Sequence, residues 1–107
     1  MRILTHRPPT HPGEMLLEEF LKPTGITQRE LTDSIHVPYQ RINELVHGRR
    51  SMTPSTALRF AKYFGTSADF WMNLQLRCEL FEAQRDEAKE LKRIRPYPKT
   101  SRVAADR

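Results

Sequence analysis

The stretch that decides the fold is residues 27–48, TQRELTDSIHVPYQRINELVHG. Its pattern predicts two short helices joined by a tight turn. Thr27 is placed to cap the first helix, and Glu30, three residues later, is placed to complete a capping box with it. Leu31 and Ile35 then fall on one face at i, i+4 spacing, so the first helix has an apolar side to bury.

The second helix is predicted to begin near Pro38, whose fixed φ and missing N–H suit a first helical turn. Gly48 is a typical C-terminal stop. The apolar face of this helix is made by Ile42, Leu45 and Val46. When the two apolar faces pack together, the first turn of the second helix points outward, carrying Tyr39, Gln40, Arg41, Asn43 and Glu44. This is the build of a helix-turn-helix, whose second helix enters the major groove of DNA.

Size and composition set the limits of this interpretation. The chain has 107 residues, 37% of them hydrophobic and 29% charged, which predicts one domain with a single modest core. Its apolar runs are far shorter than the ~18 residues of a membrane span. The lone Cys78 has no internal disulfide partner, and four scattered His with one Cys lack zinc-site spacing. We therefore expect a cytoplasmic protein without membrane, metal or cofactor, in which Cys78 is a small packed residue.

The net charge of +5 is distributed unevenly. Residues 36–62 contain five basic residues and one acidic residue, and this block covers the proposed second helix and the loop after it. Phosphate contacts belong at such a place. Residues 85–107 carry a second basic block, eight basic against four acidic residues, for which a solvated basic end is the simplest explanation.

Three further helices complete the predicted domain. The first begins at His11-Pro12, has a core face of Met15, Leu16, Phe20 and Leu21, and ends at residues 23–25. The next begins at Thr53-Pro54 and closes at Gly65, with a buried stripe predicted at Ala57, Leu58, Ala61 and Phe64. The last is capped by Ser67 and presents an apolar side of Phe70, Trp71, Leu74, Cys78 and Phe81.

The stretch after Phe81 is rich in good helix formers, so we expect helix to continue toward Ile94. The predicted division is a flexible arm over residues 1–10, a domain with its helical extension over residues 11–95, and a disordered basic tail over residues 96–107. For Trp71 and Phe81 the pattern leaves two places open, the domain core or a dimer interface, whereas for Phe70 it favours the core.

At this point the chain resembles a known family. Thr27-Gln28-x-Glu30-Leu31 followed by Ile42-x-x-Leu45-x-x-Gly48 resembles the phage-repressor-like, or XRE-type, helix-turn-helix. The flanking segments resemble the HigA-type antitoxins more narrowly. These segments are His11-Pro12-Gly13-Glu14-x-Leu16, Gly48-Arg49-Arg50-Ser51-Met52-Thr53, Ala57-Leu58-Arg59, Phe64-Gly65-Thr66-Ser67 and Phe70-Trp71-x-Asn73-Leu74-Gln75. The likeness covers residues 11 to about 84.

The resemblance implies an all-α protein, a five-helix phage-repressor-like helix-turn-helix domain with an extended C-terminal helix. It implies a homodimer that binds a palindromic double-stranded DNA operator near its own promoter and represses transcription. It also implies a HigB-type partner, an mRNA-cleaving toxin that this antitoxin would hold inactive. A single small domain reads only a half-site, which independently favours a dimer with half-sites about 34 Å apart.

The resemblance also implies which residues face DNA. Gln28 would donate to a phosphate, Tyr39, Gln40 and Glu44 occupy base-reading positions, and Arg41 and Asn43 flank them. Gln40 can pair with adenine and Arg41 with guanine. Tyr39 can contact a thymine methyl group or a phosphate, and Glu44 can accept from cytosine or orient Arg41. Arg49 and Arg50 would neutralise phosphates, and His47 would join them or cap the helix.

Three positions depart from the family pattern: Thr32 replaces a small Ala, His36 replaces the turn Gly, and Pro38 replaces a Ser or Thr cap. Thr32 must bury its hydroxyl or bond it to a helix carbonyl, and His36 must tolerate a left-handed backbone. Two alternatives therefore stay open. The chain could be a stand-alone XRE-type transcriptional regulator without a toxin, or an interaction module that no longer binds DNA.

Catalytic residues are not expected. The paired carboxylates at residues 18–19 and 86–87 are neighbours along predicted helices and do not face each other. The sequence contains no arguable Ser-His-Asp or Cys-His set, so an enzymatic function is not predicted.

Overall fold

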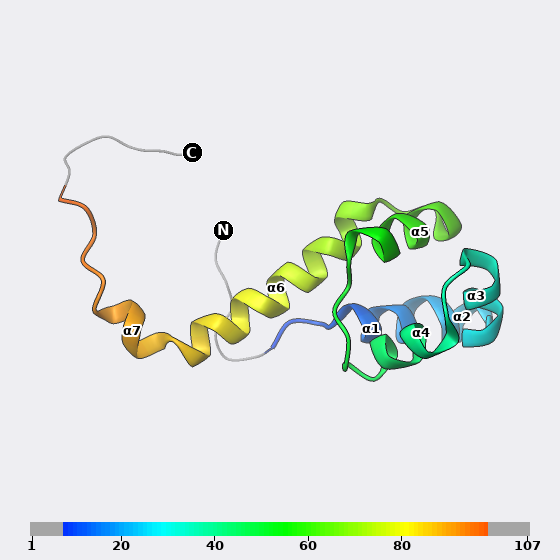
Figure 1. The fold of residues 1–107 in the computed structure, drawn as a ribbon, viewed down its shortest axis with the longest axis horizontal. Helices are drawn as coiled ribbons and strands as arrows, with labels where there is room; N and C mark the ends of the chain where they lie inside the picture. Colours follow the sequence, from blue (N-terminus) through cyan, green and yellow to red (C-terminus); the bar gives the residue numbers. More distant parts are fainter. Residues whose placement is uncertain (1–7, 99–107) are drawn as a thin grey trace.

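A computed structural model describes residues 8–98. Within this range all regular secondary structure is helical. The helices are α1 (Pro12–Met15), η1 (Leu16–Leu21), α2 (Lys22–Thr24), α3 (Gln28–Ile35), α4 (Tyr39–Val46), α5 (Pro54–Phe64), α6 (Ala68–Asp86) and α7 (Ala88–Lys92). Figure 1 shows α1 to α5 gathered in one bundle, from which α6 runs outward to α7. The predicted all-α helix-turn-helix fold with an extended C-terminal helix is confirmed.

The predicted arm and tail fall mostly beyond this range. Residues 1–7 of the arm and residues 99–107 of the tail lie outside the described residues. The last arm residues, 8–10, lead directly into the first helix. The Cys78 thiol donates to the carbonyl oxygen of Thr10 at 3.4 Å, and burial raises the pKa of this thiol above its usual value. Cys78 is thus the packed residue that the sequence predicted.

The segments α1, η1 and α2 follow one another without a break as a single irregular helix. Pro23 lies in the last turn of this helix, and the helix ends within the predicted residues 23–25, where Gly25 adopts φ 78°. A proline cannot donate to the carbonyl four residues earlier. The backbone N–H of Lys22 correspondingly bonds the carbonyl of Leu17, five residues back, in a π-helical turn.

The first helix starts with a histidine cap. The Nδ1 atom of His11 accepts a hydrogen bond of 2.9 Å from the N–H of Gly13, and Pro12 occupies the first turn as predicted. Gly13 is buried, and a Cβ added to it would lie 1.8 Å from the carbonyl oxygen of Leu45. The backbone of α1 therefore packs directly against the end of α4, and this contact fixes the position of α4.

The cap predicts a pH dependence of folding. Burial lowers the pKa of His11 below its usual value, although Glu82 and Glu14 partly oppose this effect. The unfolded chain therefore binds this proton at higher pH than the folded chain. Stability should fall as the pH drops from 7.5 through about 6.5, because protonated Nδ1 cannot accept from Gly13. The cap is worth roughly 0.5–1 kcal/mol. His11→Asn supplies a cap that does not titrate, so the free energy of unfolding measured in urea should no longer fall over this pH range. A variant with the same pH dependence of stability as the wild type would contradict the role of His11.

The core is built around Trp71. Its side chain is fully buried, and its ring lies 5.0 Å from Phe20, 4.9 Å from Phe60 and 5.0 Å from Phe70 between centroids. The indole Nε1 donates to Thr66 Oγ1 at 2.8 Å, so the polar edge of Trp71 is satisfied. Trp71 therefore belongs to the domain core and not to a dimer interface. Leu16, Leu31, Ile42 and Leu45 are buried in the same core, as predicted.

One sequence prediction on the later helices is wrong, and a second holds only with a break in the helix. Leu58, predicted in the buried stripe of α5, is 63% exposed, whereas Phe60 is fully buried. Ala57, Phe60 and Phe64 share one face at spacings of three and four, which turns Leu58 outward. The C-terminal helix is also interrupted: α6 ends at Asp86, Glu87 takes a non-helical conformation, and α7 stops at Lys92.

Candidate nucleic-acid interface

The turn between α3 and α4 sets the angle at which α4 is presented. The capping box predicted at the start of α3 is present, with Thr27 and Glu30 each bonding the other's backbone N–H. At its end, His36 adopts φ 61°, the left-handed conformation expected where the family has Gly. The Thr32 side chain is buried, and its hydroxyl donates to the carbonyl of Arg29 at 2.9 Å. Both departures from the family pattern are therefore accommodated locally.

Arg59 of α5 supports the same turn. Its Nη1 donates to the carbonyl oxygen of Ile35 at 2.7 Å. Since the last carbonyls of a helix lack partners within it, a cation at this place satisfies and stabilises the end of α3. Pro38 lies just before α4, as its N-cap with ψ 142°, and the first helical residue is Tyr39. The helix thus begins near Pro38 as predicted, with Pro38 at the cap position and not inside the first turn.

The predicted site residues lie at the start of α3, along α4 and in the loop after α4. Asn43 Nδ2 donates to Gln28 Oε1 at 3.1 Å, which joins the first turn of α3 to the middle of α4. Because its oxygen is engaged, Gln28 is left with its amide nitrogen as the group available to a further acceptor such as a phosphate.

Sequence reasoning missed Arg29 at this site. Its guanidinium carbon lies 4.4 Å from the centre of the Tyr39 ring, so the first turns of the two helices are also joined by a cation–π contact. Tyr39 is 38% exposed and keeps part of its surface open to solvent. The two residues are ten positions apart on different helices, and no short-range spacing signals their contact.

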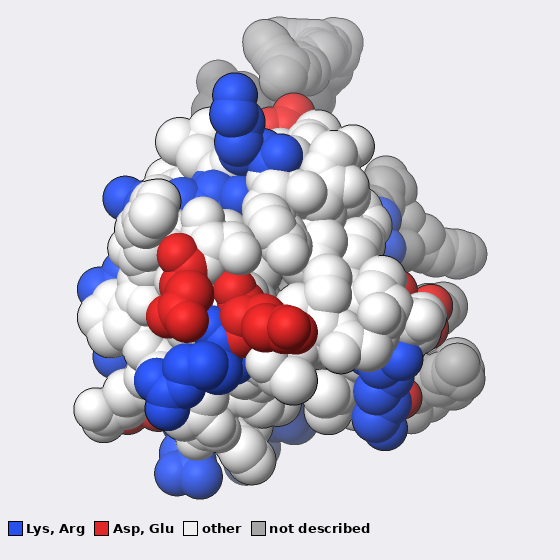
Figure 2. Space-filling view, turned by 90° about the vertical axis from the view of Figure 1, so that its right-hand side faces the viewer, with Lys and Arg blue, Asp and Glu red and all other residues white. Residues whose placement is uncertain are grey.

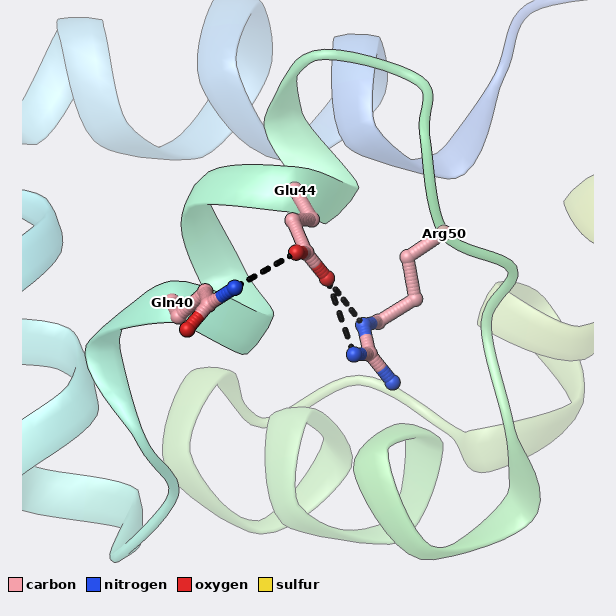
Figure 3. A network of polar contacts seen from close by, with 3 residues as sticks. All are labelled: Gln40, Glu44 and Arg50. Carbon is pink, nitrogen blue, oxygen red and sulfur yellow. Dashed lines mark hydrogen bonds and ion pairs between the residues drawn. The ribbon is translucent and has the colours of Figure 1, made fainter.

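Figure 3 shows a network centred on Glu44. Gln40 Nε2 donates to Glu44 Oε2 at 2.9 Å. Arg50 approaches Glu44 Oε1 with Nε at 3.0 Å and Nη2 at 2.8 Å. The hydrogen bond from Gln40, then that from Arg50, lowers the pKa of the Glu44 carboxyl below its usual value. Glu44 therefore orients Gln40 and Arg50, and the expectation that it orients Arg41 is wrong.

The remaining predicted residues frame this network. Arg41 is half-buried on α4, and Arg49 is exposed in the following loop. His47 Nδ1 lies 2.8 Å from the carbonyl oxygen of Asn43, which places this side chain at the C-terminal end of α4 as a cap. The loop is tied to α6, since the backbone N–H of Met52 donates to the buried Gln75 Oε1 at 2.8 Å.

On the face drawn in Figure 2, acidic and basic side chains are mixed, so charge alone does not mark an interface there. Figure 2 shows the end that lies at the right of Figure 1, where acidic side chains gather near the centre and basic side chains stand around them.

Among residues 8–98, no group of three or more His, Cys, Asp or Glu side chains is arranged to hold a metal ion. No helix in the described part of the chain is long and apolar enough to cross a membrane.

Two short helices joined by a left-handed turn, with the second one offering its first turn outward, define the helix-turn-helix class. Residues 17–71 match the family model described as helix-turn-helix. Virulence-associated protein I of Dichelobacter nodosus is 45% identical over 80 residues, 75% of this chain and 74% of that protein. Antitoxin HigA-1 of Vibrio cholerae is 33% identical over 92 residues, 86% of this chain and 87% of the relative.

A solved structure is similar over most of its length. The Pseudomonas aeruginosa antitoxin HigA with higBA promoter superposes with a TM-score of 0.78 at 37% identity, covering 82% of this chain and 97% of that one. The chain belongs to the HigA-type antitoxins within the XRE-type helix-turn-helix family.

Proposed function

We propose that this protein is a sequence-specific DNA-binding antitoxin of a type II toxin–antitoxin pair. In this proposal it neutralises a HigB-type mRNA-cleaving toxin and represses its own operon as a homodimer. The observation that carries the DNA-binding part is the outward first turn of α4, where Gln40 and Arg41 lie beside the partly exposed Tyr39.

The surrounding contacts support a preorganised DNA-reading surface. Asn43 holds the Gln28 side chain by a hydrogen bond, and Arg29 stacks on the Tyr39 ring. Both side chains are therefore positioned in the absence of DNA. Arg41 and Arg49 supply positive charge beside this turn and in the following loop for phosphates. In the similar Pseudomonas structure, the HigA antitoxin is bound to the higBA promoter. These features together favour double-stranded DNA as the ligand of this chain.

The size of the reading surface supports the proposed homodimer. One such helix contacts a half-site, and a second copy one DNA turn away, about 34 Å, supplies the other. The projecting α6 carries Leu76, 51% exposed, and Leu80, 44% exposed, one helical turn apart. This apolar strip supports the proposal that α6 contributes to the contact between the two copies.

The DNA-binding part is tested by selection from a random duplex library. The wild-type protein should enrich a palindrome whose half-sites are centred about ten base pairs apart, and the same motif should occur upstream of its own gene. Binding should weaken steeply with salt, since phosphate contacts release counterions. Enrichment of no motif, or affinity that ignores both sequence and salt, would instead favour an interaction module that does not bind DNA.

The toxin is tested by co-expression with a small ribonuclease-like protein encoded next to this chain. Expression of that protein alone should arrest growth, and this chain should restore growth and co-purify with it. Failure to restore growth, or the lack of such a neighbouring gene, would favour a stand-alone transcriptional regulator.

A further inference from the structure

Both carboxylate oxygens of Glu44 accept hydrogen bonds from other side chains of the protein. Oε2 accepts from the Gln40 amide at 2.9 Å, and Oε1 accepts from Nε and Nη2 of Arg50 at 3.0 and 2.8 Å. A carboxylate that reads cytosine must offer a lone pair to the base. Because each oxygen here already serves another side chain, this arrangement favours an action through Gln40 and Arg50 over direct base contact (Figure 3).

The contact with Gln40 limits what this exposed amide can present. One amide hydrogen is directed to Glu44, which leaves the other N–H and the carbonyl oxygen of Gln40. A neighbouring donor and acceptor are what the major-groove edge of adenine requires, since it offers N7 as an acceptor and N6 as a donor. An unrestrained Gln side chain loses rotamer entropy when it binds. Glu44 therefore prepares Gln40 for adenine before DNA arrives.

The contact with Arg50 limits nonspecific attraction. Arg50 lies in the basic loop after α4, where a free guanidinium would attract any phosphate regardless of sequence. In the structure its charge is matched by Glu44, at side-chain exposures of 44% and 28%. The carboxylate also repels nearby phosphates whatever the sequence. A sequence that rewards Gln40 offsets this loss through the base contact, whereas random DNA does not.

We propose that Glu44 is the specificity-determining positioning residue of this surface: it fixes the Gln40 amide for adenine and withholds Arg50 from the phosphates of random DNA. The inference rests on the proposed DNA-binding function and deepens it. It assigns to one carboxylate both a gain in base discrimination and a loss of sequence-independent affinity.

The experiment compares two variants by duplex-library selection and by the salt dependence of binding to a random-sequence duplex. Glu44→Gln removes the charge but keeps an oxygen that can accept from Gln40. It should raise the magnitude of the log–log salt slope by about 1, as one more phosphate contact forms, and should keep the adenine preference. Glu44→Ala should raise the slope equally and also lose the preference for adenine, roughly 5- to 100-fold.

Matched controls are available in α7, where the exposed Glu90 pairs with Arg93 at 3.7 Å. Glu90→Gln and Glu90→Ala change the net charge identically and should leave both readouts unchanged. In an Arg50→Gln background Glu44→Gln should no longer change the slope, and in a Gln40→Ala background Glu44→Ala should no longer change base preference.

The inference is overturned if Glu44→Ala keeps either the wild-type base preference or the wild-type salt slope, or if Glu90→Gln shifts the slope as much as Glu44→Gln. A wild-type protein that selects no motif is a different result, because it would contradict the proposed DNA-binding function itself.

Discussion

Replacing Gly13 by Ala should destabilise the protein by roughly 3 kcal/mol, the upper part of the usual range for overpacking. A Cβ at this position would lie 1.8 Å from the carbonyl oxygen of Leu45 and 2.6 Å from its carbonyl carbon. Both atoms belong to the backbone of α4, so no side-chain rotation relieves the clash. The first helix and α4 would have to separate, and a domain of this size has only 5–15 kcal/mol of stability in total.

Gly25→Ala is the matched control for this substitution. Gly25 has φ 78°, and its added Cβ would meet no atom within 4 Å. That change therefore costs only the left-handed conformation, roughly 1–2 kcal/mol. Urea denaturation of both variants measures the difference. If Gly13→Ala proved no more destabilising than Gly25→Ala, the direct contact between the first helix and α4 would be disproved.

The parts of the fold that the sequence predicted correctly are governed by local chemistry. Thr27 and Glu30 form their capping box within four residues, and Ser67 caps α6 through the N–H of Phe70. The left-handed turn at His36 follows from the same short-range logic, since the motif requires that conformation at this position. Helix starts and stops depend on neighbours along the chain, and these neighbours are visible in the sequence.

What the sequence did not predict depends on contacts between distant segments. Leu58 and Phe60 are similar in apolar character, and only the direction from which α6 packs decides that Phe60 is buried. From the sequence, Glu44 could accept from cytosine or orient Arg41, three residues away, whereas in the structure the loop after α4 brings Arg50 to it. The stack of Arg29 on Tyr39 likewise exists only once the turn has brought α3 against α4.

The second large effect is expected from Gln40→Ala combined with Arg41→Ala. Each bidentate pair with a base gives ~1–3 kcal/mol of discrimination, so the double variant should lose roughly 2–6 kcal/mol of specific binding. Stability should be little changed, because Gln40 is exposed and Arg41 only half-buried at the start of α4. Nonspecific binding should fall less, since other basic residues still meet the phosphates.

The chain offers a control of the same composition. Gln84 and Arg85 form the same pair of residue types, both exposed, near the end of α6 and away from α4 (Figure 1). Gln84→Ala with Arg85→Ala removes the same groups and the same charge. Because Gln84 lies one turn after Leu80 on α6, the oligomeric state of this variant is measured first, and with that state unchanged it should bind the selected duplex as the wild type does.

The central claim is that the outward turn of α4 reads the edges of base pairs. The most direct measurement is a competition assay in which each protein chooses between the wild-type-selected duplex and a scrambled duplex of equal length. The account predicts that the Gln40→Ala, Arg41→Ala protein loses this choice while its melting temperature and helical signal stay as in wild type. A double variant that is folded and still prefers the selected duplex as strongly as wild type would contradict the account.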